Sequence, residues 1–183
     1  MADAAVCVFC GARDGQDPAY RKAAEETGRM LARNGWELVY GAGDIGLMGA
    51  VARAAQDAGG RTLGVIPEHL VGREGIVRDL TRHVVTETMH ERKKVMFMNS
   101  HAIAVLPGGA GSLDELFEVL TWRQLGLHDK PIFLLNTKGY WTPLIQLVEH
   151  VIAHGFADDS LGGMLRMVDD PQALGTALRA ALS

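Results

Sequence analysis

Short apolar runs alternate with longer amphipathic stretches along most of the chain. Each run is four to six residues long, and the clearest ones do not alternate strictly between apolar and polar residues. Strands that are buried on both faces of a sheet have this pattern. The predicted strands cover residues 5–10, 37–40, 62–66, 83–86, 102–106 and 131–135.

The segments between these runs carry apolar residues at helical spacing. In the first of them, Tyr20 and Leu31 belong to one apolar stripe, with Asp17 and Pro18 as a start signal and Asn34 before a glycine as a stop signal. Further helices are predicted over residues 47–58, 89–99, 112–125, 141–154 and 171–182. The segment 69–80 is more polar, and we expect a long loop there with about one turn of helix.

The alternation of strands and helices predicts the fold class. Repeated βα units of this length favour an α/β fold with a Rossmann-like, doubly wound parallel sheet and helices on both faces. No repeat, linker or block of charge divides the chain. We therefore predict a single domain over residues 1–183, a Rossmann-like nucleotide-binding or hydrolase domain.

Composition narrows the class of partner. The chain has 183 residues, with 18 basic and 22 acidic side chains and a net charge of −4. This balance argues against nucleic acid or a membrane surface as a partner. No apolar stretch approaches the roughly 20 residues needed to span a bilayer, the N-terminus lacks the features of a signal peptide, and two cysteines make no disulfide framework. We expect a cytoplasmic protein.

The first of two glycine-rich loops follows the predicted strand 37–40. Gly41, Gly43 and Gly46 match the G-x-G-x-x-G pattern that places a phosphate at a helix N-terminus. Glu68, about twenty residues further on, is a candidate for the acid that binds a ribose. This loop alone suggests an NAD-linked oxidoreductase, although the dinucleotide fingerprint usually follows the first strand. The alternative is that the glycines serve only a tight turn and close packing.

The second loop follows the predicted strand 102–106 and precedes a long helix. Gly108, Gly109 and Gly111 let the backbone approach an anion, and Ser112 adds a hydroxyl. No lysine follows, so the loop is not a Walker A motif, and a monophosphate suits it better than a triphosphate with magnesium. The alternative is a capping box formed by Ser112 and Glu115, which needs no ligand.

Two ordered motifs resemble a known family. Residues 107–115, PGGAGSLDE, resemble the PGGxGTxxE signature of the LONELY GUY (LOG) family, and residues 89–93, MHERK, resemble its MHxRK segment. The similarity extends over nearly the whole chain up to about Phe156. The members are cytokinin riboside 5′-monophosphate phosphoribohydrolases, long mislabelled as lysine decarboxylases.

The resemblance implies a reaction and a set of site residues. It implies hydrolysis of the N-glycosidic bond of a nucleoside 5′-monophosphate, with an adenine or N6-substituted adenine base, to free base and ribose 5-phosphate. It also implies a homodimer with sites near the interface, no cofactor and no metal. Arg92 and Glu115 match the catalytic pair. The expected substrate-binding residues are Lys93, Gly108, Gly109, Ala110, Gly111, Ser112, Leu113, Asp114 and Thr121, together with Gly41 and Gly43 of the first loop.

This sequence departs from the family pattern at three places. Ser112 replaces a threonine, which keeps the hydroxyl and loses a methyl group. Ala42 replaces a glycine of the first loop, which narrows the room near a ligand. The stretch 73–82 is longer than in plant members, which leaves base recognition open.

The chemistry of the residues agrees with glycoside cleavage. Positive charge grows on the ribose carbon as the bond breaks, and a carboxylate such as Glu115 stabilises it and orients water. Arg92 supplies a permanent planar cation. The alternative for Arg92 and Lys93 is a solvated basic patch with Arg82, Lys94 and His90. A nucleotide-binding protein without catalysis is the main alternative function.

Three further patterns concern subunit contacts, thiol chemistry and metal binding. The helix 112–125 carries apolar residues on more than one face, which predicts a subunit interface or, alternatively, burial by its neighbours within the monomer. Cys7 and Cys10 form a C-x-x-C, but strand positions i and i+3 point to opposite faces, so two buried thiols are expected. His150 and His154 lie one helical turn apart without a third ligand and are interpreted as a solvated helix face.

Overall fold

Seven parallel strands form one sheet in the order β4-β3-β2-β1-β5-β6-β7. The computed structural model describes residues 4–74 and 79–183. The strands are β1 (Ala5–Phe9), β2 (Glu37–Tyr40), β3 (Thr62–Pro67), β4 (Arg82–Thr86), β5 (Ala102–Val105), β6 (Ile132–Leu135) and β7 (Leu165–Val168). The predicted doubly wound parallel sheet is confirmed.

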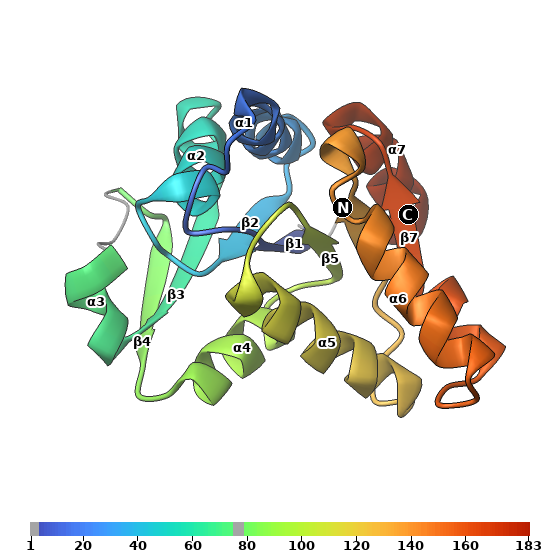
Figure 1. Ribbon diagram of the computed structural model, residues 1–183. Helices are drawn as coiled ribbons and strands as arrows, with labels where there is room; N and C mark the ends of the chain where they lie inside the picture. The colour runs from blue at the N-terminus through green and yellow to red at the C-terminus, as the bar shows by residue number, and fades with distance from the viewer. Residues whose placement is uncertain (1–3, 75–78) are drawn as a thin grey trace.

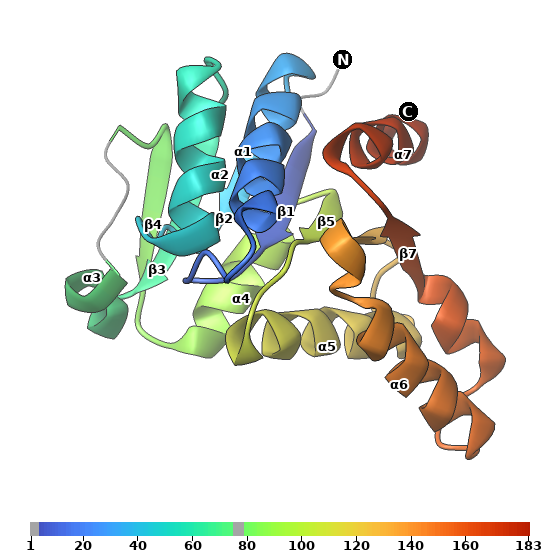
Figure 2. The ribbon, with the colours of Figure 1, turned by 45° about the horizontal axis from the view of Figure 1, so that its top comes forward.

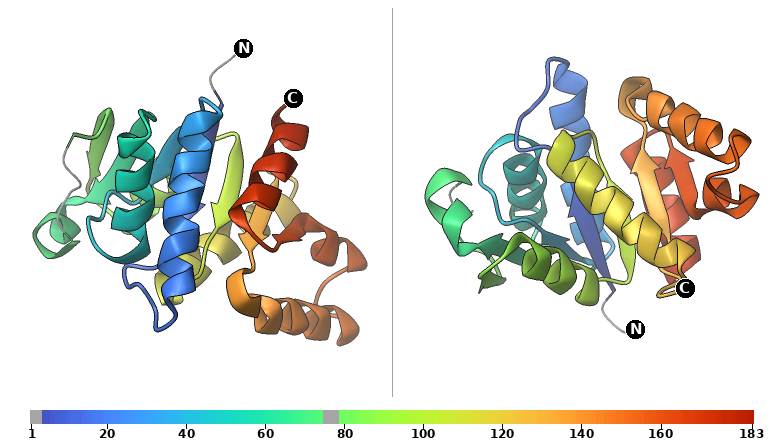
Figure 3. Two further views of the ribbon diagram at one scale, coloured as in Figure 1. Left: turned by 90° about the horizontal axis from the view of Figure 1, so that it is seen from above. Right: turned by 60° about the horizontal axis from the view of Figure 1, so that its bottom comes forward.

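Helices cover both faces of the sheet (Figure 1). They are α1 (Pro18–Arg33), α2 (Gly46–Asp57), α3 (Glu68–Glu74), α4 (Met89–Met98), α5 (Ala110–Gln124), α6 (Thr142–Ala153) and α7 (Pro171–Leu182), with short 3-10 turns η1 (Thr137–Gly139) and η2 (Asp159–Met164). Figures 2 and 3 show α1, α2 and α7 on one face and α4, α5 and α6 on the other. In the described residues, no helix is long and apolar enough to cross a membrane.

Each face of the sheet has its own apolar core. Along β1, Val6 and Val8 face α1, α2 and α7, whereas Cys7 and Phe9 face α4, α5 and α6. The apolar side chains at successive positions are therefore all buried, which explains why the predicted strands lack a polar face. Cys7 and Cys10 are free buried thiols on opposite sides, as expected.

The chain reverses its direction of winding between β1 and β5. Strands β1 to β4 are added towards one edge, and β5 to β7 are added on the other side of β1. The crossovers on the two sides diverge at this point, which leaves a crevice outside the carboxyl ends of the two strands. The loops that follow β1 and β5 therefore border this crevice, which is where a ligand site is expected.

The structure differs from the sequence prediction in one strand, in the segment 69–80 and at the ends of several elements. β7 was missed because its short apolar run, LRMV, is interrupted by Arg166. The segment predicted as a loop with one turn of helix begins instead with seven-residue α3, and the part at 75–78 lies outside the described residues. α5 begins at Ala110 rather than Ser112. β1 ends at Phe9, one residue earlier than predicted.

Candidate active site

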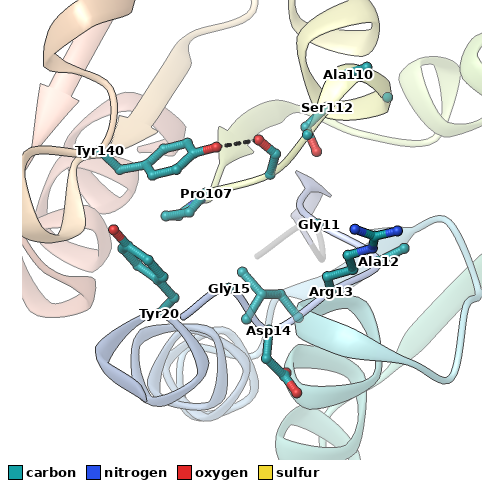
Figure 4. Close-up of a pocket in the computed structure, with 14 residues that line it drawn as sticks. Gly11, Ala12, Arg13, Asp14, Gly15, Tyr20, Pro107, Ala110, Ser112 and Tyr140 are labelled. Carbon is teal, nitrogen blue, oxygen red and sulfur yellow. Dashed lines mark hydrogen bonds between the residues drawn. The ribbon is translucent and has the colours of Figure 1, made fainter. Parts of the chain in front are cut away.

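A cavity of about 480 Å³ lies outside the carboxyl ends of β1 and β5 (Figure 4). Its wall on one side is the loop that connects β1 to α1, and its wall on the other is the loop between β5 and α5. It is lined by Gly11, Ala12, Arg13, Asp14, Gly15, Tyr20, Leu47, Pro107, Gly108, Gly109, Ala110, Gly111, Ser112 and Tyr140. The second glycine-rich loop predicted from the sequence is therefore a wall of the cavity.

The segment 107–112, hereafter the anion loop, places the N-terminus of α5 at this cavity. Gly109 occupies the N-cap and offers no side chain to cap the helix. The first amides of a helix have no intrahelical acceptor and carry the positive end of its dipole. Because Ser112 lies inside the helix and not at its N-cap, the alternative of a Ser112–Glu115 capping box is wrong. The arrangement is that of an anion-binding helix terminus.

The three glycines of the anion loop have different surroundings. A Cβ on Gly108 would collide with the Ser112 side chain and with the amide of Gly11. A Cβ on Gly109 or Gly111 would meet nothing within 4 Å, so these positions border open space. Packing alone therefore explains Gly108, whereas Gly109 and Gly111 leave room for a ligand beside the backbone.

The first glycine-rich loop, residues 41–46, does not line this cavity. The amides of Leu47 and Met48, at the start of α2, donate hydrogen bonds to the carbonyl of Gly11 at 3.0 and 3.3 Å. These two donors are thus occupied by the protein itself, which argues against a dinucleotide phosphate at this helix. Gly41 and Gly43 are buried and do not line the cavity.

Ala42 shows why a glycine suits its position. Its backbone φ is 60°, in the left-handed region, and its side chain is fully buried. This conformation costs an L-residue about 1–2 kcal/mol. The departure from the family pattern therefore introduces backbone strain, while the methyl group packs near Gly64 of β3.

Arg92 of α4 is buried against the carboxyl ends of β2 and β3. Its Nε donates to the Val65 carbonyl at 3.0 Å, and its Nη2 donates to the Gly41 carbonyl at 2.7 Å. A Cβ on Gly41 would occupy the position of this guanidinium, which explains the glycine there. The solvated basic patch considered for Arg92 and Lys93 is wrong, because both side chains are buried.

Lys93 ties α4 to α5. Its Nζ lies 2.9 Å from Asp114 Oδ2 and 3.1 Å from Glu118 Oε2. Burial alone would lower the pKa of Lys93, but the hydrogen bonds to these carboxylates raise it above its ordinary value of 10.5. Arg92 and Glu115 are the neighbours in sequence of Lys93 and Asp114. The ion pairs therefore hold together the two helix segments that carry the predicted catalytic pair.

Glu115 is buried in the first turns of α5. It acts electrostatically on Cys10, which follows β1: burial raises the pKa of this thiol, the Glu115 carboxylate raises it further, and the Arg92 guanidinium lowers it. Both charges of the predicted pair thus act on the same buried thiol at the carboxyl end of β1. The structure brings Arg92 and Glu115 to one region from helices more than twenty residues apart in sequence.

Several other residues that the sequence suggested for the site lie outside the lining of the cavity. Thr121 is exposed and lies nine residues after Ser112, about 14 Å along α5. Asp114 is exposed and paired with Lys93. Leu113 is half-buried and Glu68, the candidate ribose acid, is exposed on α3. None of these four residues lines the cavity, and neither do Arg92, Lys93 and Glu115.

Sequence reasoning missed the aromatic wall of the cavity. Tyr140, after η1, donates its hydroxyl to the Gly108 carbonyl at 2.5 Å and packs edge-on against Tyr20 of α1. Figure 4 shows the Tyr140 hydroxyl directed at the anion loop, with the Tyr20 ring below it on α1. No motif links them, since they are 120 positions apart. The loop after β1 could have been found, because the carboxyl end of a first strand is a usual ligand site.

The described residues hold no group of three or more histidine, cysteine, aspartate or glutamate side chains arranged for a metal ion. His150 and His154 stack with ring centroids 4.0 Å apart on the exposed face of α6. The ring of His154 is hydrogen-bonded to the His150 carbonyl at 2.9 Å. This agrees with the interpretation of a solvated helix face.

Fold and site together define a Rossmann-like α/β protein with a helix N-terminus that has no side-chain cap at the switch point of its sheet. Residues 48–178 match a family model described as possible lysine decarboxylase. The chain is 42% identical over 176 residues to the cytokinin riboside 5′-monophosphate phosphoribohydrolase of Rhodococcoides fascians, covering 96% of this chain and 89% of that protein. It is 44% identical over 156 residues to LOG3 of Arabidopsis thaliana, covering 82% and 70%. The chain belongs to this LOG family.

Solved structures support the fold. The molybdenum cofactor carrier protein of Chlamydomonas reinhardtii superposes with a TM-score of 0.77 at 22% identity over 98% of both chains. The molybdenum cofactor binding protein of Rippkaea orientalis gives a TM-score of 0.75 at 21% identity, over 100% of this chain and 99% of that one. At this identity the similarity concerns the fold alone.

Proposed function

We propose that this protein hydrolyses the N-glycosidic bond of an adenosine 5′-monophosphate, N6-substituted in a cytokinin nucleotide, to the free base and ribose 5-phosphate. Its relatives are named for this activity, and 42–44% identity over most of the chain supports its transfer. The observation that carries the proposal is the uncapped N-terminus of α5 at the cavity, about one and a half helical turns before the buried Glu115.

In the proposed mechanism the anion loop binds the 5′-phosphate through backbone amides and the α5 dipole. Water adds its oxygen to C1′ while the C1′–N bond breaks, and the bonding pair leaves with the base, which takes up a proton. Glu115 stabilises the positive charge that develops at C1′ and accepts a proton from the water. Arg92, a permanent cation, offers its guanidinium to ribose hydroxyls or to the departing base.

The phosphate lies away from the bond that breaks and serves to position the sugar. A riboside without phosphate should therefore be a poor substrate. Base release is measured by chromatography for AMP, an N6-prenylated AMP and the matching ribosides. Equal kcat/KM for nucleotide and riboside would remove the anion loop from the mechanism. Absence of base release with retained nucleotide binding would indicate a binding protein without catalysis.

Glu115→Gln keeps the shape of the side chain and removes its charge, so turnover should be lost with the fold intact. Glu149→Gln, an exposed change on α6, is the matched control and should keep full activity. A fully active Glu115→Gln variant would reassign the acid, and Asp114 would be the next candidate.

We also propose that the protein is a cytoplasmic homodimer that uses the face formed by α4 and α5. Large apolar side chains are exposed there and just beyond α5, namely Met98, Phe117, Leu125 and Leu127. Exposed apolar patches on a soluble domain mark interaction sites, and both helices lie on one face (Figure 3). A second copy would also bring another α5, with its exposed Thr121, towards this face.

The dimer is tested by light scattering coupled to size-exclusion chromatography. Leu125→Glu places a charge in the proposed interface and should give a monomer. Leu147→Glu, an equally conspicuous exposed leucine on α6, is the control and should leave the dimer intact. A wild-type protein that is monomeric at micromolar concentration would refute this proposal.

A further inference from the structure

Tyr140 and its neighbour Trp141 hold the β5–α5 segment at two points. Trp141 is buried and donates its indole Nε1 to the Val105 carbonyl at 3.2 Å. Tyr140 donates its hydroxyl to the Gly108 carbonyl at 2.5 Å. The two acceptors are the last residue of β5 and the second residue of the anion loop. Adjacent residues at the start of α6 thus fix the point where the strand becomes the loop.

A tight turn sets this aromatic pair in place. Within η1, Lys138 and Gly139 both have positive φ, at 58° and 73°, which turns the chain sharply after β6. The Trp141 amide then donates to the side chain of Asn136 at 2.7 Å and closes the turn. The ring of Tyr140 packs edge-on against Trp141, with ring centroids 4.8 Å apart. The hydroxyl of Tyr140 is therefore held by its surroundings before any ligand arrives.

The bond to Gly108 acts on the most adjustable peptide of the anion loop. Gly108 and Gly109 both lack a Cβ, so the peptide between them can rotate with little steric cost. The Gly108 carbonyl and the Gly109 amide belong to one planar trans peptide and point in opposite directions. A hydrogen bond to the carbonyl therefore fixes the direction of the amide as well. It also reduces the repulsion that the carbonyl oxygen would exert on an anion in the cavity.

We propose that Tyr140 is a positioning residue for phosphate recognition, whose hydroxyl holds the Gly108–Gly109 peptide in the orientation that receives the 5′-phosphate. The inference rests on the proposed function for the identity of the anion. From the β1–α1 loop, the Gly11 amide donates to the Pro107 carbonyl at 3.0 Å, so the anion loop is held at two adjacent residues, Pro107 and Gly108. Of these two contacts, only the one from Tyr140 comes from a side chain.

The test compares Tyr140→Phe with wild type in two assays. Kinetics are measured with AMP or an N6-prenylated AMP and with the matching riboside, and calorimetry measures binding of ribose 5-phosphate. Loss of this hydrogen bond should raise KM for the nucleotide and Kd for ribose 5-phosphate about 3- to 10-fold. The kcat for the nucleotide and kcat/KM for the riboside should stay within about twofold of wild type, because the riboside has no phosphate to position.

Tyr40→Phe is the matched control. It removes the hydroxyl of a fully buried tyrosine that has no hydrogen-bond partner among the described residues. Nucleotide KM and ribose 5-phosphate affinity should match wild type. A parallel loss with riboside and nucleotide in Tyr140→Phe, accompanied by a lower Tm, would show a merely structural role and overturn the proposal.

The outcomes separate this inference from the proposed function. Unchanged KM and Kd in Tyr140→Phe, with an active wild type, would overturn the role of Tyr140 alone. An inactive wild type that binds ribose 5-phosphate more tightly than Tyr140→Phe would support Tyr140 and refute the glycosidase activity. A wild type that neither hydrolyses nucleotide nor binds ribose 5-phosphate would refute both.

Discussion

The ion pairs between α4 and α5 give a graded prediction for stability. Lys93 is buried and contacts two carboxylates whose surroundings differ, because the side chain of Glu118 is 23% exposed and that of Asp114 is 61% exposed. A hydrogen bond between charged groups away from water contributes about 1.5–3 kcal/mol. An exposed ion pair contributes about 0–1 kcal/mol. Glu118→Gln should therefore destabilise the protein more than Asp114→Asn does.

The difference is large enough to measure. Urea unfolding followed by circular dichroism should show losses of about 1.5–3 kcal/mol for Glu118→Gln and at most about 1 kcal/mol for Asp114→Asn. For a chain of this size, 1 kcal/mol corresponds to a shift in Tm of about 2–4 °C. If Asp114→Asn lowered the free energy of unfolding as much as Glu118→Gln does, Lys93–Glu118 would not be the stronger of the two contacts, and the reasoning would be refuted.

The same ion pairs predict a dependence on pH. In the folded protein the pKa of Lys93 is higher than its ordinary value of 10.5, which is also its value in the unfolded chain. Below pH 10.5 the charged ammonium therefore makes its full contribution to the free energy of unfolding. The contribution disappears as pH rises through the raised pKa of the folded state. The stability difference between wild type and Lys93→Met should thus be constant from pH 6 to about 9 and shrink at higher pH. A difference that grows above pH 10 would contradict the sign of the shift.

Three further changes test the remaining structure. Gly28→Ala pushes a methyl group into the backbone of α2 and should cost about 1–3 kcal/mol in urea unfolding, whereas Gly163→Ala, which borders open space, should not. Arg92→Lys cannot reproduce two directed hydrogen bonds to backbone carbonyls and should lower kcat/KM at least about 100-fold without unfolding the protein. Burial raises the pKa of the Cys7 and Cys10 thiols, so iodoacetamide at pH 8 should modify them only after denaturation; rapid modification of the native protein would contradict their burial.

Much of the fold followed from the sequence because buried parallel strands have a strong pattern. Six of the seven strands were predicted with each end within one residue, and five of these six are buried along their whole length. The seventh, Leu165–Val168, lies at the edge of the sheet, where only one residue is fully buried. The other edge strand, β4, is as exposed but was predicted, so the edge position alone does not explain the miss; the short run at Leu165–Val168 is interrupted by Arg166.

The site was predicted in part, and the errors have local causes. The pattern S/T-x-x-E occurs twice, at Ser112 and at Thr88, but only Thr88 forms a capping box with Glu91. Glycine at position 109 takes the N-cap of α5 and displaces Ser112 into the helix. A four-residue sequence pattern does not show where a helix begins. The first residue of α5 depends on where the preceding strand ends.

Burial of charge was the other feature that the sequence did not reveal. Arg92 and Lys93 sit in a run of basic residues that looks like a solvated surface. Their burial depends on acceptors from distant segments: carbonyls at the ends of β2 and β3 for Arg92, and carboxylates of α5 for Lys93. Such partners become visible only when the strands are placed side by side.

Gly11 links the two glycine-rich segments through its own peptide groups. Its amide is bonded to Pro107, and its carbonyl receives the amides of Leu47 and Met48. If Pro107 moves by a small distance, either these hydrogen bonds lengthen or the first residues of α2 move as well. Gly11 therefore connects the wall of the cavity to the start of α2, one of three helices on that face of the sheet, through backbone hydrogen bonds alone.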